Sequence, residues 1–174
     1  DMIVTSGGVS RGDYDLVRLV LRKLGEVLFS LLDMGPGRAV TLSIIKGAPR
    51  TKKAPVPVFG LPGPPNGCLV DFEMLVRPAI LKMRGLTTFA HHSVEATAVD
   101  SVPNKMNMAY VRYTHLEETE DGYQVTLNVT DRVGVLTAMA TTNSFTVIPK
   151  GSVVNAGDKV MVLPLSWSRD RFLL

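Results

Sequence analysis

Two glycine-containing loops are the parts of this sequence whose residue types and spacing could do chemistry. The first contains Gly7, Gly8 and Gly12, followed by Asp13 and Asp15. Glycines allow positive φ and a close approach to a ligand, and free N–H groups before a helix favour a phosphate or another oxyanion. The two carboxylates could hold a divalent cation or orient a water. Alternatively, the glycines make a tight turn and the aspartates only start a helix.

The second loop leads from a short apolar segment into a helical pattern and contains Gly60, Pro62, Gly63 and Pro65. The prolines stiffen the loop, while the glycines leave its backbone open. Such a rigid wall suits a flat ligand rich in heteroatoms, although a plain rigid turn fits the composition equally well. In the first loop, Ser10 can add a hydroxyl group. Neither loop has the spacing of a Walker P-loop or a dinucleotide fingerprint.

The elements that must position these loops follow a strand–loop–helix order that occurs twice. We expect strands at residues 2–6, 27–32 and 56–59, and helices at residues 14–24 and 66–83. In the first helix Val17, Val20, Leu21 and Leu24 form an apolar face, and Gly25 suits the position after its end. In the second helix, Pro78 should cause a bend or a break. This order predicts a doubly wound α/β domain with both loops at the carboxyl ends of its strands.

The second half of the chain is rich in Val and Thr. We expect short strands at residues 94–99, 108–113, 123–129, 144–148 and 159–164, separated by turn signals. Five such strands predict a small antiparallel barrel or sandwich. We therefore place part of an α/β domain at residues 1–86 and a small β domain at residues 87–174.

Composition excludes several classes of protein. The chain has 174 residues, of which 45% are hydrophobic, and a net charge of +3, too small to imply nucleic-acid binding. Residues 1–85 carry 12 Lys and Arg against 7 Asp and Glu, a modest preference for anions. Cys68 is the single cysteine, which excludes an internal disulfide framework and fits a reducing cytoplasm. No uncharged stretch predicts a membrane span.

The first expected strand begins at residue 2, and the sequence has neither a methionine at position 1 nor a signal peptide before it. A strand of this kind, followed directly by a glycine loop and a helix, usually has neighbours on both sides in a parallel sheet. We therefore expect that further βα units precede it and that the sequence is a C-terminal fragment. Such a fragment should be inactive by itself and should associate through its unpaired edge.

The two loops, taken with other motifs in the same order, resemble one family. The motifs are Thr5-Ser6-Gly7-Gly8-Val9-Ser10-Arg11-Gly12-Asp13-Tyr14-Asp15, Pro36-Gly37, Phe59-Gly60-Leu61-Pro62-Gly63, Pro65, Phe72, Arg77-Pro78, Tyr110-Val111-Arg112, Gly134, Phe145–Pro149, Ala156-Gly157-Asp158 and Val160. This set is similar to the molybdopterin molybdenumtransferases, the molybdenum insertases of cofactor biosynthesis, and to the C-terminal half of gephyrin. The similarity covers nearly the whole chain, but less than half of the family's length.

The resemblance implies an enzyme that inserts molybdate into adenylylated molybdopterin and releases AMP, assisted by Mg²⁺ or another divalent cation. Asp15 and Asp13 would be the catalytic and metal-binding carboxylates, Asp15 being the stronger candidate. The pterin substrate would be bound by the residues of the glycine loops and one arginine: Gly7, Gly8, Ser10, Gly12, Arg38, Gly60, Pro62, Gly63 and Pro65. The resemblance also implies a cytoplasmic homodimer that binds neither nucleic acid nor a membrane.

Departures from the family pattern leave three interpretations open. Leu31 and Gly35 stand where the family has lysines, Arg38 stands where a lysine is usual, and Val135 follows Gly134 where a serine is usual. The family's Gly-Asn-Pro-x-Ser is here Gly63-Pro64-Pro65-Asn66-Gly67. A basic loop with Arg50, Lys52 and Lys53 could replace the lost charge, although an ordinary solvated loop is an alternative. The chain could come from a working insertase, from a paralogue that binds pterin or a protein without insertion, or from a scaffold module.

Overall fold

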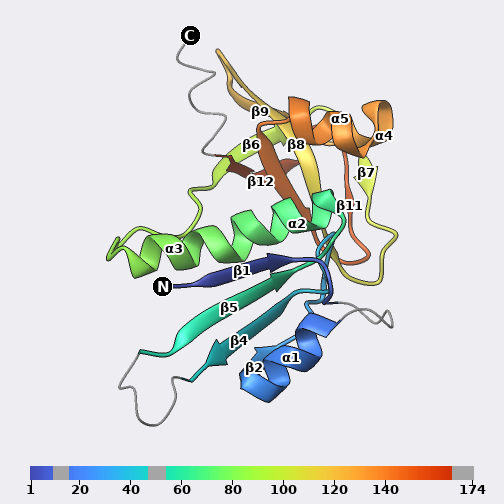
Figure 1. The fold of residues 1–174 in the computed structure, drawn as a ribbon. Helices are drawn as coiled ribbons and strands as arrows, with labels where there is room; N and C mark the ends of the chain where they lie inside the picture. The colour runs from blue at the N-terminus through green and yellow to red at the C-terminus, as the bar shows by residue number, and fades with distance from the viewer. Residues whose placement is uncertain (10–15, 47–53, 166–174) are drawn as a thin grey trace. The chain divides into compact units, whose positions relative to one another are not determined.

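The structure is a computed structural model that describes residues 1–9, 16–46 and 54–165. The chain divides into two compact units, residues 1–89 and residues 90–174, and each is described by itself (Figure 1). The functional domain limit at residues 86 and 87 stays a prediction. Among the described residues, no helix combines the length and the apolar character that a membrane crossing needs.

The first unit contains a four-stranded sheet with helices on both faces. Its elements are β1 (Ile3–Ser6), α1 (Leu16–Leu24), β2 (Gly25–Phe29), β3 (Met34–Gly35), β4 (Thr41–Ile45), β5 (Val56–Leu61), α2 (Pro65–Asp71), η1 (Phe72–Val76) and α3 (Arg77–Met83). The strand order is β1-β5-β4-β2, in which β1 and β5 are parallel while β4 runs antiparallel to both of its neighbours. Only one pair of this α/β sheet is therefore parallel.

The core of the first unit lies between the sheet and the helical rod formed by α2, η1 and α3. Val40, Phe59, Leu61 and Val76 are its buried members. Successive residues of a strand face opposite sides of the sheet, so Gly60 faces away from the side on which Phe59 and Leu61 lie. On that opposite side, a Cβ atom added at Gly60 would lie 2.7 Å from Val9 Cγ1. The α1 helix thus covers one face, and the long helical rod covers the other.

The structure of this sheet differs from the sequence predictions at three points. The strand expected at residues 27–32 is β2, Gly25–Phe29, and the sequence pattern missed β4 entirely. Gly25 does not end the α1 helix in a left-handed conformation but opens β2, where an added Cβ would lie 2.1 Å from the Ile44 carbonyl oxygen. Glycine is needed at this position because the neighbouring backbone is so close.

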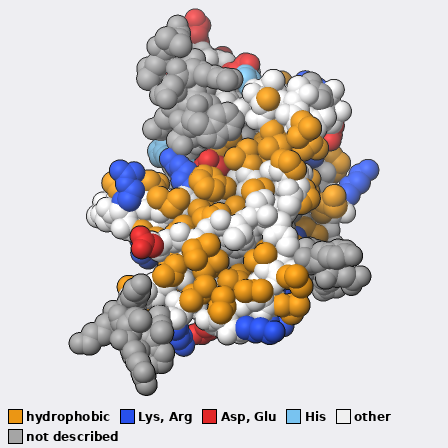
Figure 2. All heavy atoms as spheres, in the orientation of Figure 1, with side chains coloured by type: hydrophobic (Ala, Val, Ile, Leu, Met, Phe, Trp, Pro, Cys, Tyr) orange, Lys and Arg blue, Asp and Glu red, His pale blue; other side chains and the backbone are white. Residues whose placement is uncertain are grey.

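The apolar face of α1 is only partly buried. Leu21 is buried and Val17 is half-buried, but the predicted core residues Val20 and Leu24 are 47% and 56% exposed. Leu16 and Leu19 are exposed as well. Figure 2 shows hydrophobic side chains at the surface over α1 and the neighbouring strands of this sheet.

The expected second helix forms, but its middle is a wider turn. The Arg77 N–H bonds to the Phe72 carbonyl, five residues back rather than four. Pro78 has no N–H, and in a regular α-helix its ring would clash with the carbonyl of residue 74. A local π-turn before the proline accommodates the ring, so the helix continues rather than breaks.

The second unit is a small closed barrel. Its barrel strands are β6 (Val94–Ala98), β8 (Ala109–Thr119), β9 (Gly122–Thr126), β10 (Ser144–Ile148) and β12 (Lys159–Pro164). They pair in the order β10-β12-β6-β9-β8, and β8 pairs with β10 to close the ring. Every pair is antiparallel except β6 with β9. The predicted fold class, an α/β domain followed by a small β-barrel, is confirmed.

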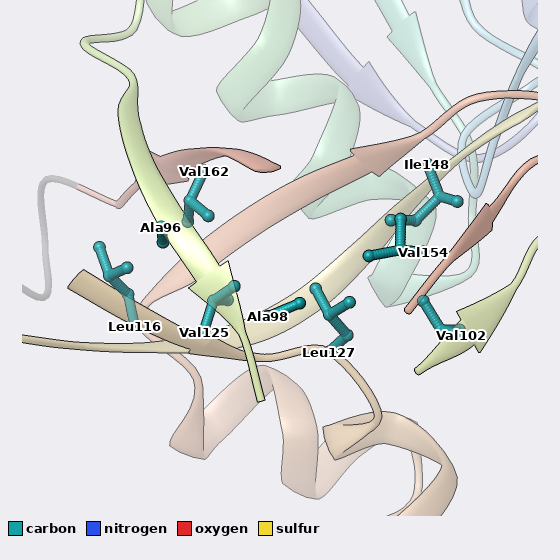
Figure 3. Close-up of a cluster of buried hydrophobic side chains, with 9 residues drawn as sticks. All are labelled: Ala96, Ala98, Val102, Leu116, Val125, Leu127, Ile148, Val154 and Val162. Carbon is teal, nitrogen blue, oxygen red and sulfur yellow. The ribbon is translucent and has the colours of Figure 1, made fainter. Parts of the chain in front are cut away.

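Small aliphatic side chains fill the barrel, as Figure 3 shows. Its buried members are Ala96, Ala98, Val102, Leu116, Val125, Leu127, Ile148, Val154 and Val162. The sequence pattern missed four short elements: β7 (Val102–Pro103), β11 (Val153–Val154), α4 (Val129–Val133) and α5 (Val135–Thr141). The first two pair with each other, while α4 and α5 follow one another between β9 and β10.

Candidate functional site

The carboxyl ends of β1 and β5 lie at the same edge of the first sheet because these strands are parallel, and α2 begins there (Figure 1). The Gly7 N–H donates a hydrogen bond of 2.9 Å to the Leu61 carbonyl. A Cβ at Gly63 would lie 3.8 Å from the Gly7 Cα. The two glycine loops therefore lie against each other, although Gly7 and Leu61 are 54 residues apart in sequence.

Side chains also join these loops. The Ser6 hydroxyl donates to the Pro62 carbonyl at 3.3 Å. The Cys68 thiol, one turn into α2, donates to Ser6 Oγ at 3.6 Å. Cys68 is half-buried and packs against the core of the first unit. These contacts fix the end of β1 relative to the start of α2.

A third loop, residues 35–38, reaches the same place. A Cβ at Gly67 on α2 would lie 2.9 Å from the Gly37 nitrogen and 3.1 Å from Pro62 Cγ. The base of the loop is closed by a hydrogen bond from the Leu32 N–H to the Arg38 carbonyl. The Arg38 side chain is exposed. We call residues 6–9, 35–38 and 61–67 together the loop junction.

Because Gly60 has no side chain, the first glycine loop can pack directly on the sheet. Thr5 on β1 and Thr41 on β4 flank Gly60 in one row across three strands. Val9, which is 2% exposed, packs in the space that the missing side chain leaves. The hydroxyls of both threonines are buried and have no hydrogen-bond partner among the described residues.

Asp71, at the end of α2, lies beneath this junction. It is 0% exposed, and neither carboxyl oxygen has a hydrogen-bond partner in the described part of the chain. Loss of hydration on burial raises the pKa of this carboxyl to about 7. The sequence carried only a weak signal for it, since Asp71 stands one helical turn after Gly67 and one turn before the apolar Leu75.

The structure brings some of the predicted site residues together. Gly7, Gly63, Pro62 and Arg38 belong to the loop junction, as does Pro65, which begins α2. Gly7 and Gly8 have the expected positive φ angles of 85° and 72°. The Gly7 N–H is not free for a ligand as expected, because it already bonds to Leu61.

Other predicted residues cannot be placed. Ser10, Gly12, Asp13 and Asp15 lie outside the described residues, as does the basic loop with Arg50, Lys52 and Lys53. Within the residues that the structure describes, there is no group of three or more His, Cys, Asp or Glu that could hold a metal ion. The roles assigned to Asp13 and Asp15 stay predictions.

Comparison with known proteins confirms the resemblance predicted from the sequence. Residues 1–82 match the family described as "Probable molybdopterin binding domain". Over 155 residues, the chain is 30% identical to the molybdopterin molybdenumtransferase of Staphylococcus aureus (strain COL), which covers 87% of this chain and 35% of that protein. It is 31% identical over 155 residues to the enzyme of that name from Bacillus subtilis (strain 168), with 87% and 34% covered.

A solved structure is similar over almost the whole chain. The molybdopterin biosynthesis moeA protein from Pyrococcus horikosii has a TM-score of 0.72 at 27% identity, covering 94% of this chain and 37% of that one. The match extends past residue 82, so it includes the β-barrel as well as the α/β unit. The chain spans about a third of the length of the curated relatives it matches.

Proposed function

We propose that this chain, whose residues 1–82 belong to the family of probable molybdopterin binding domains, serves molybdenum cofactor biosynthesis as the C-terminal part of a molybdenum insertase. The full protein would insert molybdate into adenylylated molybdopterin and release AMP. Relatives that cover 87% of the chain carry the name of that enzyme. The substrate in this proposal is a phosphorylated pterin.

The observation that carries the proposal is the convergence of three loops at one end of the sheet. Gly7 and Gly63 are near enough for contact, and Gly67 packs on Gly37. Backbone without side chains leaves room for a ligand to come close, and the carboxyl ends of strands in open α/β sheets are the usual place for one.

Charge at the junction suits an anionic group. Arg38 follows Gly37 directly, and its guanidinium is exposed at the end of a loop that a Leu32–Arg38 hydrogen bond closes. Arginine binds phosphate through paired N–H donors. In the proposed complex Arg38 binds a phosphate of the substrate, while the exposed Gly63 and Pro65 shape the wall against which the pterin lies. Gly60 and Pro62, also expected to bind the pterin, are buried, and Val9 covers Gly60.

Asp13 and Asp15 are proposed to hold a divalent cation near the phosphoanhydride. A bound cation would offset negative charge that develops on the leaving AMP. This role rests on the family resemblance and on the position of both carboxylates after the glycine loop. The homodimer expected from the family is part of the same proposal.

AMP release and molybdenum incorporation by the full-length protein test the proposal. We expect Asp15→Asn to lower AMP release with folding intact, and Glu95→Gln, which removes an exposed carboxylate on β6, to leave it unchanged. Unchanged turnover in Asp15→Asn would remove Asp15 from the mechanism. No turnover in the wild type would contradict the insertase.

A second candidate is a paralogue that binds pterin without insertion. It is favoured by Leu31 and Gly35, since the resembling family has lysines at these positions and lost cations weaken an oxyanion site. Gly35 is buried and Leu31 is 42% exposed, so neither position supplies charge. Pterin binding without AMP release would favour this candidate. Binding of a partner peptide without pterin would favour a scaffold instead.

A further inference from the structure

We propose that Asp71 is a positioning residue of the loop junction and that it links anion binding to proton uptake, so that the site holds a dianion more tightly when the Asp71 carboxyl carries a proton. This inference rests on the proposed function, because it assumes that the junction binds an anion. It assigns a role to a carboxyl that lies outside both glycine loops.

The burial of Asp71 is unusual for a structural residue. A carboxylate without hydrogen bonds costs several kcal/mol to bury, so buried acids are ordinarily paired. Both oxygens of Asp71 lack a hydrogen-bond partner among the described residues. Its pKa is raised to about 7 by desolvation, so protonated and ionised forms are both populated near neutral pH. Asp71 therefore exchanges a proton near neutral pH.

The carboxyl lies directly against the loop that carries Arg38. A Cβ on Gly37 would be 2.3 Å from Asp71 Oδ1 and 2.7 Å from its Cγ, so the carboxyl occupies the space that glycine leaves. Gly67, one turn earlier on the same helix, packs on the Gly37 nitrogen. Two residues of α2 thus hold Gly37 from one side. A change in the charge or position of the Asp71 carboxyl therefore acts directly on Gly37, the residue that precedes Arg38.

The other charges around Asp71 do not cancel its effect. On its own helix, Glu73 and Arg77 form an ion pair of 3.8 Å. On the loop, Arg38 and the exposed Asp33 are the charged side chains. Cys68, also on α2, bonds to Ser6. Burial raises the pKa of the Asp71 carboxyl, and none of these groups offsets that effect when Asp71 loses its proton.

The direction of the coupling follows from Coulomb's law. An ionised Asp71 places a negative charge beneath the junction, where low dielectric keeps it poorly screened, and so opposes a dianion. It also attracts the Arg38 guanidinium, which the anion needs. Protonation removes both effects. By linkage, a bound dianion must in turn favour the protonated form of Asp71.

Sulfate is a suitable probe because it stays a dianion across the pH range of interest. Its affinity for the full chain can be measured by calorimetry between about pH 5.5 and 8.5, for the wild type and for Asp71→Asn. We expect wild-type affinity to fall about fivefold or more as pH rises. Asp71→Asn, which is neutral at every pH, should show a much smaller fall. Glu95→Asn, at an exposed position on β6, is the control and should behave as the wild type.

A second measurement needs no variant. The side-chain carboxyl ¹³C resonance of Asp71, followed by NMR, should titrate at higher pH when sulfate is saturating than when it is absent. An equal pH dependence in wild type and Asp71→Asn, or a titration that sulfate does not shift, would overturn the inference while leaving the anion site in place. A wild type that binds no sulfate at any pH would instead contradict the proposed function, and the inference with it.

Discussion

The Asp71 carboxyl fills the space of the side chain that Gly37 lacks. An added Cβ would lie 2.3 Å from Asp71 Oδ1, and Gly37 has a φ of 103°. Residue 37 therefore combines a left-handed backbone with a contact that only glycine permits. Because Gly37 precedes Arg38, this pair connects a buried acid on α2 to the exposed cation of the loop junction.

Gly37→Ala should destabilise the protein by at least about 2 kcal/mol more than Gly85→Ala, because it adds a clash to the same backbone strain. Gly85 is a matched control, since its φ is 82° and no atom lies within 4 Å of an added Cβ. Urea unfolding measures both changes. In the Gly37→Ala/Asp71→Ala double variant the clash is relieved, so its cost should be less than the sum of the two single costs. Additive costs would contradict the contact.

The contribution of Asp71 to the stability of the protein should fall as pH rises from about 4 to 7. In this range the folded state keeps the Asp71 proton, since its pKa is about 7, while the unfolded state has released it at the ordinary value of 3.8. The unfolded state binds fewer protons, so rising pH favours unfolding, by at most about 1.4 kcal/mol per pH unit. Below the lower value the contribution of Asp71 is fully present, and above pH 7 it is lost.

Urea unfolding of wild type and Asp71→Asn across this range checks the prediction. The difference in unfolding free energy between the two proteins should change with pH and then level off above about pH 7. Glu95→Asn serves as control for the loss of one exposed carboxylate. Parallel pH profiles for wild type and Asp71→Asn would show that Asp71 has an ordinary pKa.

Gly67→Ala should weaken ligand binding at the loop junction, whereas Gly85→Ala, outside the junction, should not. The added Cβ at residue 67 would lie 2.9 Å from the Gly37 nitrogen, while no atom lies within 4 Å of a Cβ added at residue 85. Both changes cost stability, the first through this backbone contact and the second through its φ of 82°, so sulfate affinity is measured where urea unfolding shows both variants to be folded. Equal affinities in the two variants would argue against close packing of these loops.

The buried amide of Asn104 should stabilise the barrel. Its Nδ2 donates to the carbonyls of Met108, Ile148 and Pro149, and its Oδ1 accepts from the Met106 N–H. Asn104→Ala leaves these groups without partners and should cost roughly 2–4 kcal/mol in urea unfolding. Asn155→Ala, at an exposed turn, should cost less than about 1 kcal/mol. Equal costs would contradict this role.

Self-association should depend on the exposed apolar surface of the first unit. β1 is the end strand of its sheet, with Ile3 and Val4 45% and 42% exposed, and Leu19 and Leu24 on α1 are more than half exposed. Leu24→Lys should lower the weight-average mass in sedimentation equilibrium. Val153→Lys, which alters an equally exposed position in the second unit, should leave it unchanged. A monomeric wild type would contradict the expected association.

Periodicity predicted the fold well where one face of an element is buried. The strands at β1, β5, β6, β10 and β12 and both long helices were expected within a few residues. β4 was missed because Thr41 and Ser43 are buried polar residues that remove the apolar alternation. The exposed Val20 and Leu24 could not be foreseen, because a sequence pattern shows that a face is apolar and not what covers it.

The site was predictable in part. Glycine and proline spacing located both loops, since these residues are demanded by backbone conformation. The same spacing could not show that the Gly7 N–H bonds to Leu61, because that depends on the register between β1 and β5. Asp71 was missed because its significance comes from Gly37, a contact 34 residues away in sequence.

Binding of the phosphorylated pterin at the loop junction can be measured through amide NMR shifts. On titration with adenylylated molybdopterin, we predict the largest shifts at Gly8, Arg38 and Gly63, and small ones at barrel residues such as Val125. Arg38→Ala should reduce the affinity, while Arg84→Ala, at an exposed position of the same unit, should not. Shifts confined to the barrel, or no shifts at the three loops, would contradict binding of the pterin at the loop junction.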